Sequence, residues 1–194
     1  MAVTLTWIEW ITGETPGTTP HDTFSFKTGG DTPPTITSAS NINFGNVSSR
    51  DITAASNPVT AGSNSFTKYF RVNFSGSYTS ISNAKLWKSA GAYVTGESIQ
   101  FSGNIAYAAP TETDASDGAV ATATPTNNVG LNAYDPADTA AQDKTLPNGS
   151  ESASSPGYYS GSRTSTMRFQ MITTGSSPAG AVNQKTISLS YDRT

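Results

Sequence analysis

Apolar and polar residues alternate along several short segments of the chain, and this period of two predicts β-strands. The clearest alternation covers residues 3–7, 66–74, 164–172 and 186–192. No segment shows the 3.6-residue apolar period of an amphipathic helix, so we expect very little helix. The pattern therefore predicts a chain built from short strands.

The alternation also assigns side chains to the two faces of each strand. One face of a strand is shared by Phe66, Lys68, Phe70, Val72 and Phe74, and one face of another by Met167, Phe169 and Met171. In the last strand we expect Ile187, Leu189 and Tyr191 to face inward. Weaker candidate strands are 24–27, 36, 42–44, 83–89, 98–101 and 104–107, with Gly103 as a break between the last two. In the first run Ile8, Trp10 and Ile11 fall out of phase, which indicates a bulge or a strand buried on both faces.

Turn-rich segments divide the chain into parts. Residues 29–34, with two glycines and two prolines, read as a linker. We therefore separate an extended N-terminal arm, residues 1–34, from a domain at residues 35–194. Strand candidates recur in this domain every roughly 8–15 residues, as in sandwiches and barrels. We expect an antiparallel β-sandwich, jelly-roll-like, with long loops.

Residues 110–162 differ in composition from the rest of the domain. They are rich in Ala, Thr, Asp, Asn, Pro and Gly and hold few large apolar residues. A loop of this length inside a compact domain is often functional. We expect a long loop here, either an interface or exposed to the medium.

Composition limits the partners. The chain has 11 Lys and Arg, 14 Asp and Glu, a net charge of −3 and no Cys. A nucleic-acid-binding face needs clustered basic residues, whereas Lys85 and Lys88 read as two solvated strand residues. No apolar run approaches the ~20 residues of a membrane helix. We expect no nucleic-acid partner, no membrane association and no secretory signal.

Candidate catalytic groups are few and scattered. Glu9 and Glu14 form a candidate acid–base pair of the glycosidase type, and His21 beside Asp22 is a candidate base with its orienting group. Nothing in the sequence brings Glu9 and Glu14 together, and a His in a turn-rich segment is usually solvated. We expect no enzyme, no catalytic residue and no cofactor, and keep a glycosidase as an alternative.

One acidic segment bears on metal binding. Glu112, Asp114 and Asp117 precede Gly118, and spaced carboxylates beside a glycine can ligate Ca²⁺. The EF-hand spacing is not met, because the third acid comes one residue late and no Glu closes the loop. A solvated acidic turn is the expectation, and a weak Ca²⁺ site near Asp114 and Asp117 is the alternative.

The tryptophans are the candidate contact residues. Exposed Trp side chains anchor protein interfaces and stack on sugar rings, although most Trp residues lie in cores. We expect Trp7 and Trp10 to anchor the arm on a neighbouring subunit. If the protein binds a glycan, the stacking candidates are Trp10, Trp87 and a tyrosine of the Tyr158-Tyr159 loop.

Four segments carry a resemblance to a known group of proteins. They are LTWIEWITG at residues 5–13, YFRVNFSG at 69–76, AKLW at 84–87 and ISLSYD at 187–192. With them the chain resembles small β-rich virion proteins of tailed bacteriophages, which include capsid decoration (cement) proteins, head fibres, and tail-tube or baseplate subunits. The resemblance implies a noncatalytic β-sandwich or jelly-roll in the virion, assembled in the host cytoplasm, and carries over no functional residues.

The resemblance also implies partners. We expect other copies of this chain and a major capsid or tail protein, with the chain acting as a capsid decoration subunit that binds neighbouring capsid subunits. The alternatives are a carbohydrate-binding or tail-fibre adhesion module, and a tail-tube or baseplate subunit.

Overall fold

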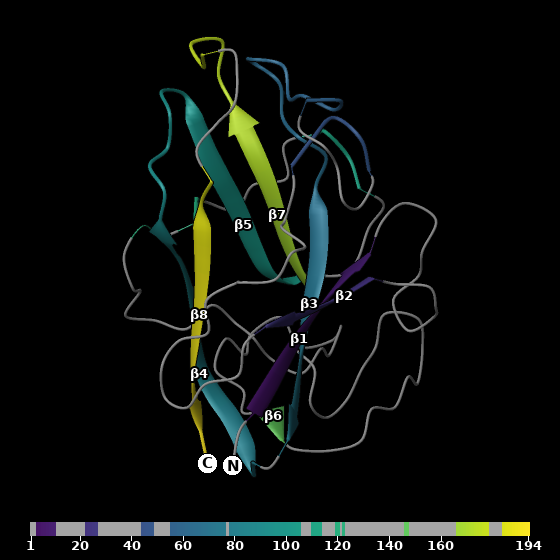
Figure 1. The fold of residues 1–194 in the computed structure, drawn as a ribbon, viewed down its shortest axis with the longest axis vertical. Helices are drawn as coiled ribbons and strands as arrows, with labels where there is room; N and C mark the ends of the chain where they lie inside the picture. The colour runs from purple at the N-terminus through teal and green to yellow at the C-terminus, as the bar shows by residue number, and fades with distance from the viewer. Residues whose placement is uncertain are drawn as a thin grey trace.

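The structure is a computed structural model, and all elements in the part of the chain that it describes are β-strands (Figure 1), as the alternation predicts. The described residues are 3–10, 22–26, 44–48, 55–76, 78–105, 110–113, 119–120, 122, 146–147, 166–178 and 184–194. The strands form two sheets in which every neighbouring pair is antiparallel.

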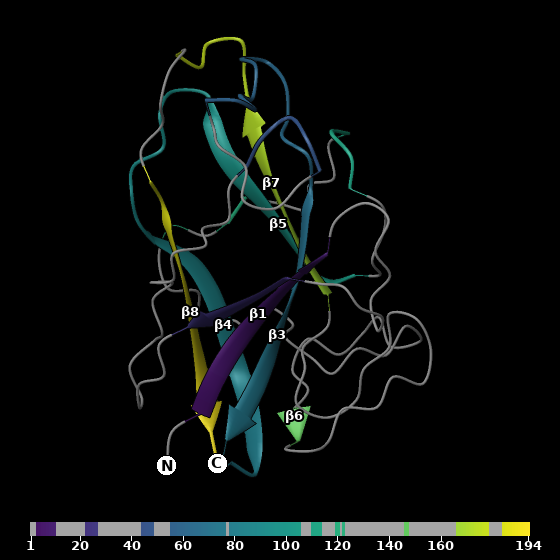
Figure 2. The same ribbon diagram turned by 45° about the vertical axis from the view of Figure 1, so that its right-hand side comes forward.

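The larger sheet has five strands in the order β2-β1-β3-β7-β5. Their bounds are β1 (Val3–Trp10), β2 (Asp22–Phe26), β3 (Lys68–Gly76), β5 (Glu97–Ile105) and β7 (Thr166–Thr173). The smaller sheet has the order β6-β4-β8, with β4 (Ser80–Ala90), β6 (Leu146–Pro147) and β8 (Thr186–Arg193). Figures 1 and 2 show β4 and β8 as a pair set apart from β5 and β7.

One apolar core draws on both sheets. Its buried residues are Trp7, Phe70, Val72, Phe74, Tyr78, Ile81, Leu86, Ile99, Val120, Met167, Phe169, Ile187 and Leu189. Phe74 of β3 meets Tyr191 of β8 edge-to-face, with ring centroids 5.2 Å apart, and this aromatic contact joins the two sheets. The inward face predicted for β8 is therefore confirmed, with Tyr191 only partly buried, and the shared face predicted for β7 is the buried one.

Two segments of the N-terminal residues, predicted as an arm at 1–34, are strands of the larger sheet. β1 lies inside the larger sheet, with β2 on one side and β3 on the other. Its register with β3 runs without a shift from Val3 opposite Gly76 to Trp10 opposite Tyr69. The described part of β1 therefore has no bulge, and alternation of apolar residues with threonine is enough to make it a sheet strand. The linker predicted at 29–34 lies outside the described residues.

Other boundaries differ from the prediction for local reasons. The predicted break at Gly103 is wrong, because β5 runs from Glu97 to Ile105 and takes up the glycine in a register shift against β7. Phe44, a weak strand candidate, lies outside any strand and packs against the core.

The predicted loop 110–162 is tied to the sheets at several points. Leu146 pairs with Ile81 of β4, Ala119 forms a bridge with Gln100, and Thr111 exchanges hydrogen bonds with Thr67. The described parts of the segment therefore continue the sheets and cover them.

Candidate functional site

The contact between β1 and β3 is the best-defined candidate site, and we call it the hairpin dock: Trp7 and Glu9 of β1 against Lys68 and Phe70 of β3. All four side chains are buried; Trp7 is 2% exposed and Lys68 is 3% exposed. The Trp7 and Phe70 rings meet edge-to-face with centroids 6.1 Å apart. Strand alternation places Trp7 and Glu9 on the same face of β1. Trp7 therefore packs in this contact, and Glu9 brings a negative charge to it.

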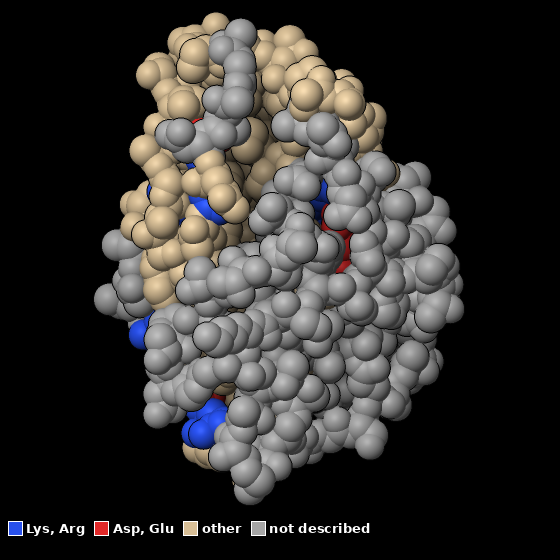
Figure 3. Space-filling model, in the orientation of Figure 1, with Lys and Arg blue, Asp and Glu red and all other residues tan. Residues whose placement is uncertain are grey.

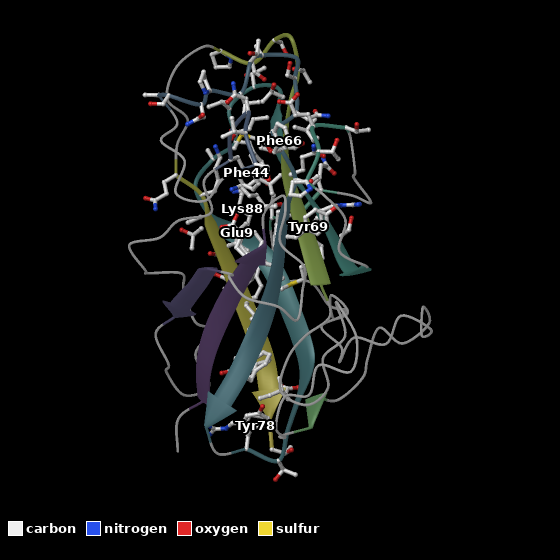
Figure 4. All side chains as sticks on the ribbon, turned by 90° about the vertical axis from the view of Figure 1, so that its right-hand side faces the viewer. Glu9, Phe44, Phe66, Tyr69, Tyr78 and Lys88 are labelled. Carbon is white, nitrogen blue, oxygen red and sulfur yellow. The ribbon has the colours of Figure 1, made fainter. Side chains whose placement is uncertain are left out.

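An ion pair closes the hairpin dock. The Lys68 Nζ lies 2.9 Å from the Glu9 Oε1, and both side chains are almost wholly out of solvent. A lone buried charge costs several kcal/mol, whereas an opposite charge at hydrogen-bond distance compensates much of that cost. The pair therefore selects the one register in which the carboxylate meets the ammonium. Figure 4 shows Glu9 at the end of β1 nearer the middle of the molecule.

The structure changes the interpretation of the N-terminal candidates. Trp7 lies in the core of its own chain, because it fills the space beside Phe70. Its role as an anchor on a neighbouring subunit stays a prediction. Trp10 pairs in register with Tyr69, and its side chain lies outside the described residues. Glu9 is engaged by Lys68, and Glu14 lies outside the described residues.

A second charged cluster lies between β4 and β5, and we call it the lysine clamp: Lys88, Tyr93, Glu97 and Lys185. The Lys185 Nζ lies 2.5 Å and 2.6 Å from the two Glu97 carboxylate oxygens. The Lys88 ammonium donates to the Gly91 carbonyl and lies 4.9 Å from the centroid of the Tyr93 ring. The Lys185 ammonium lies 5.8 Å from the same centroid.

Two residues of the clamp also accept hydrogen bonds from backbone N–H groups in and after the β4–β5 connection. The Val94 N–H donates to the Glu97 carboxylate at 3.0 Å, and the Ile99 N–H donates to the Tyr93 hydroxyl at 3.2 Å. Burial, with the negative charge of Glu97 nearby, raises the pKa of the Tyr93 hydroxyl, and the Ile99 N–H opposes that rise. A neutral phenol between two ammonium groups can therefore offer its ring face to both.

Sequence reasoning missed the clamp. Lys88, predicted to be solvated, is buried, and its place two residues after Leu86 puts it on the inner face of β4. The even spacing from the apolar Leu86 was the sequence feature that could have predicted the burial of Lys88. Glu97 and Lys185 are 88 positions apart in the sequence, so no local pattern could have predicted that they pair. Lys85 and Trp87 are half-buried on the same strand.

A third feature is a surface formed by three segments of the described chain, residues 57–63, 91–96 and 174–178, which we call the hydroxyl tip. The sequence of these three segments contains no Asp, Glu, Lys or Arg. The Thr173 hydroxyl donates to the Ser63 carbonyl at 2.7 Å, lies 3.1 Å from the Thr60 carbonyl oxygen and accepts from the Gly62 N–H. The Thr174 N–H donates to the Gly96 carbonyl at 2.9 Å. These bonds join the three segments into one surface.

The remaining candidates do not converge on a site within the described residues. Glu112 is exposed, and Asp114, Asp117 and His21 lie outside those residues. The described side chains include no group of three His, Cys, Asp or Glu placed to hold a metal ion. The same residues contain no helix long and apolar enough to cross a membrane.

Basic side chains are spread over the visible surface. Figure 3 shows the described Lys and Arg side chains at separate points on the face it presents, with no continuous basic patch on that face.

Comparison with known proteins adds no relative. Neither a scan against protein-family models nor searches of curated proteins and of solved structures found a match. The function must therefore be inferred from the residues and contacts of this chain.

Proposed function

We propose that this chain is a noncatalytic structural subunit of a tailed-bacteriophage virion, and that it acts as a capsid decoration protein bound to neighbouring capsid subunits. We further propose that its two sheets pack as a β-sandwich with jelly-roll-like connections. From β3 to β8 the strands alternate between the larger and the smaller sheet, and connections that cross between two sheets are a feature of jelly-rolls. The core shared by both sheets supports the same packing.

The observation that carries the proposal is the use of charge inside the molecule. Glu9 pairs with Lys68, and Glu97 pairs with Lys185, so each buried carboxylate ties strands distant in sequence. A glycosidase acid must reach the substrate, but Glu9 is 3% exposed and held by an ammonium. These contacts suit a rigid scaffold better than a reaction centre.

The surface supports assembly as well. The hydroxyl tip offers backbone and hydroxyl groups for hydrogen bonding without charge. Copies that stand side by side on a shell repel one another less when the facing surfaces are neutral. Repetition over many symmetric positions lets each contact be weak while the assembly gains from multivalency.

Purified virions provide the test. We expect peptide mass spectrometry to find the chain in purified particles of the phage that encodes it, in a fixed ratio to the major capsid protein. Cryo-electron microscopy should then place it on the capsid surface. Presence of the chain only in the soluble fraction of infected cells, at any salt concentration of purification, would overturn the proposal.

Carbohydrate binding is a second candidate because Trp87 on β4 keeps part of its indole accessible, and an accessible indole can stack on a sugar. A glycan array with wild type and Trp87→Ala separates the two functions. Binding that disappears in Trp87→Ala, together with absence from virions, favours the glycan-binding module. Equal array signals for the two proteins contradict it.

A further inference from the structure

We propose that the β1–β2 hairpin is exchanged between copies of this chain: the hairpin of one copy lies beside β3 of a second copy and completes the hairpin dock there. The inference deepens the proposed function and rests on it, because it names a second copy as an assembly partner. The donated residues are Trp7 and Glu9, and the receiving residues are Lys68 and Phe70.

The position of the hairpin in the sheet makes exchange possible. Among the described strands, β2 pairs only with β1, and β1 pairs only with β2 and β3, although Trp7 of β1 also belongs to the shared core. The hairpin therefore sits at one end of the five-stranded sheet and is joined to the rest by a single ladder, from Val3–Gly76 to Trp10–Tyr69. One ladder is what a strand from another molecule can replace, as in donor-strand complementation.

The chemistry of the dock limits the occupant. A β3 without its neighbour would expose an unpaired strand edge, the face of Phe70 and an ammonium whose carboxylate has left. The replacing strand must present a Trp and, two residues later, a carboxylate on the same face. The pattern Trp-x-Glu occurs in this sequence only at residues 7–9. The occupant that fits is therefore the same hairpin from another copy.

The connection is long enough to reach a neighbour. The body of the chain is anchored from Phe44 onward, since Phe44 packs on the core and the Gly45 carbonyl accepts from the Phe66 N–H. Residues 27–43 lie between this anchor and the end of β2. Seventeen residues span up to roughly 55–60 Å when extended, by about 3.3–3.6 Å per residue. The exchanged dock has the same contacts as the closed one, so exchange costs little beyond association.

Disulfide trapping tests the exchange, and the natural chain has no Cys to interfere. Thr6 and Asn73 are register partners across β1 and β3, and Cα atoms of such partners lie within disulfide reach. Thr6→Cys and Asn73→Cys are made as separate full-length chains, mixed, unfolded, refolded together at high concentration and oxidised. We expect a disulfide dimer that needs both variants, with the 6–73 linkage shown by peptide mass spectrometry.

A matched pair in the body of the molecule controls for random collision. Lys85 and Ser190 are register partners across β4 and β8, so a mixture of Lys85→Cys and Ser190→Cys should give no linked 85–190 peptide. Thr6→Cys/Asn73→Cys in one chain should form the same linkage. If that double variant closes only within monomers and the mixture gives no 6–73 dimer, the exchange is wrong. If the double variant forms no disulfide at all, the pairing of β1 with β3 is wrong and the exchange falls with it.

The trapping result and the virion result are separable. A 6–73 dimer of purified protein stands even if virions lack the chain, in which case the proposed virion function fails alone. Virions that contain the natural chain, together with a purified mixture of the two Cys variants that gives no 6–73 dimer, leave the virion function standing and remove the exchange.

Discussion

The ion pair between Glu9 and Lys68 is the single most consequential contact of the hairpin dock, because neither group has much access to water. Removal of one partner leaves the other charge buried, which typically costs about 3–5 kcal/mol. A variant that lacks both charges leaves neither charge buried without a partner and avoids this cost. We therefore expect Lys68→Met and Glu9→Gln each to lower the free energy of unfolding strongly, and the double variant to recover much of the loss.

Urea denaturation of the four proteins measures this coupling through a double-mutant cycle. Lys85→Met, which removes a half-buried lysine of β4, is the matched control and should cost less than about 1 kcal/mol. Additive losses in Glu9→Gln and Lys68→Met would show that the two residues do not interact in the folded protein.

Tyr93 gives the molecule a dependence on alkaline pH. Burial raises the pKa of its hydroxyl above the ordinary value of 10.0. The unfolded chain therefore loses this proton first, and the contribution to stability is lost as pH rises from about 10 through the higher folded pKa. At neutral pH we expect Tyr93→Phe to be about 1 kcal/mol less stable than wild type, because the Ile99 N–H loses its acceptor.

The difference between wild type and Tyr93→Phe should then shrink between about pH 9.5 and 11, since only wild type has this proton to lose. Unfolding free energies from urea curves at each pH provide the measurement. A difference that stays constant over this range would contradict the assignment of the raised pKa to the folded state.

At the scale of elements, Gly91 decides whether the β4–β5 connection can form. Its φ is +79°, and a Cβ there would lie 2.2 Å from the Gln184 carbonyl oxygen and 2.9 Å from the Lys185 Cα. Both atoms belong to backbone beside the lysine clamp, so they cannot turn aside as a side chain can. We expect Gly91→Ala to cost about 2 kcal/mol or more through strain and overlap together.

Two other glycines separate these causes. Gly62 has a φ of +83° but only ordinary contacts, so Gly62→Ala should cost about 1 kcal/mol from backbone strain alone. At Gly175 an added Cβ would have no neighbouring atom within 4 Å, so Gly175→Ala should be close to neutral. Thermal unfolding midpoints of the three variants rank the effects, and an equal drop in all three would rule out a special role for Gly91.

The strands themselves followed from local pattern. Residues 66–74 alternate in a way that only a strand with one apolar face satisfies, and the structure has β3 at Lys68–Gly76 with Phe70, Val72 and Phe74 buried. The strand predicted at residues 186–192 is confirmed for the same reason. Alternation is a property of neighbours in sequence, so it needs no knowledge of the rest of the fold.

The local pattern did not predict which strands pair with one another. The Gly- and Pro-rich segment at residues 29–34 predicts an arm that ends there, and no local feature of the sequence indicates the pairing of β1 with β3. Alternation places Lys68 on the inner face, but its match with Glu9 depends on that pairing and not on any nearby residue. Long-range register is set by the fit of two distant faces, which a single strand sequence does not encode.

For the whole molecule, the length of the connection between the hairpin and its anchor should set the balance between closed and exchanged forms. A shortened hinge strains the closed form, whereas the exchanged form releases that strain. We expect deletion of residues 29–34 to shift the protein toward dimers or larger oligomers, and insertion of six Gly and Ser residues at the same place to favour the monomer.

Size-exclusion chromatography with light scattering over a hundredfold range of protein concentration measures this balance, since exchanged forms must gain with concentration. Deletion of residues 178–180, in the connection after β7, is the control and should leave the balance unchanged. Identical monomer fractions in the deletion, insertion and wild-type proteins would show that the connection does not control assembly.

The order of the strands along the chain also sets the order in which the ribosome makes them. The hairpin is complete by residue 26, whereas β8, the partner of β4, begins only at residue 186. A ribosome adding about 5–20 residues per second takes on the order of ten seconds or more to pass from one to the other. An isolated two-stranded hairpin is at best marginally stable. Neighbouring ribosomes on one messenger RNA therefore hold several unattached hairpins close to several unfinished sheets. Within this interval of synthesis, a hairpin can pair either with β3 of its own chain or with β3 of a neighbouring nascent chain.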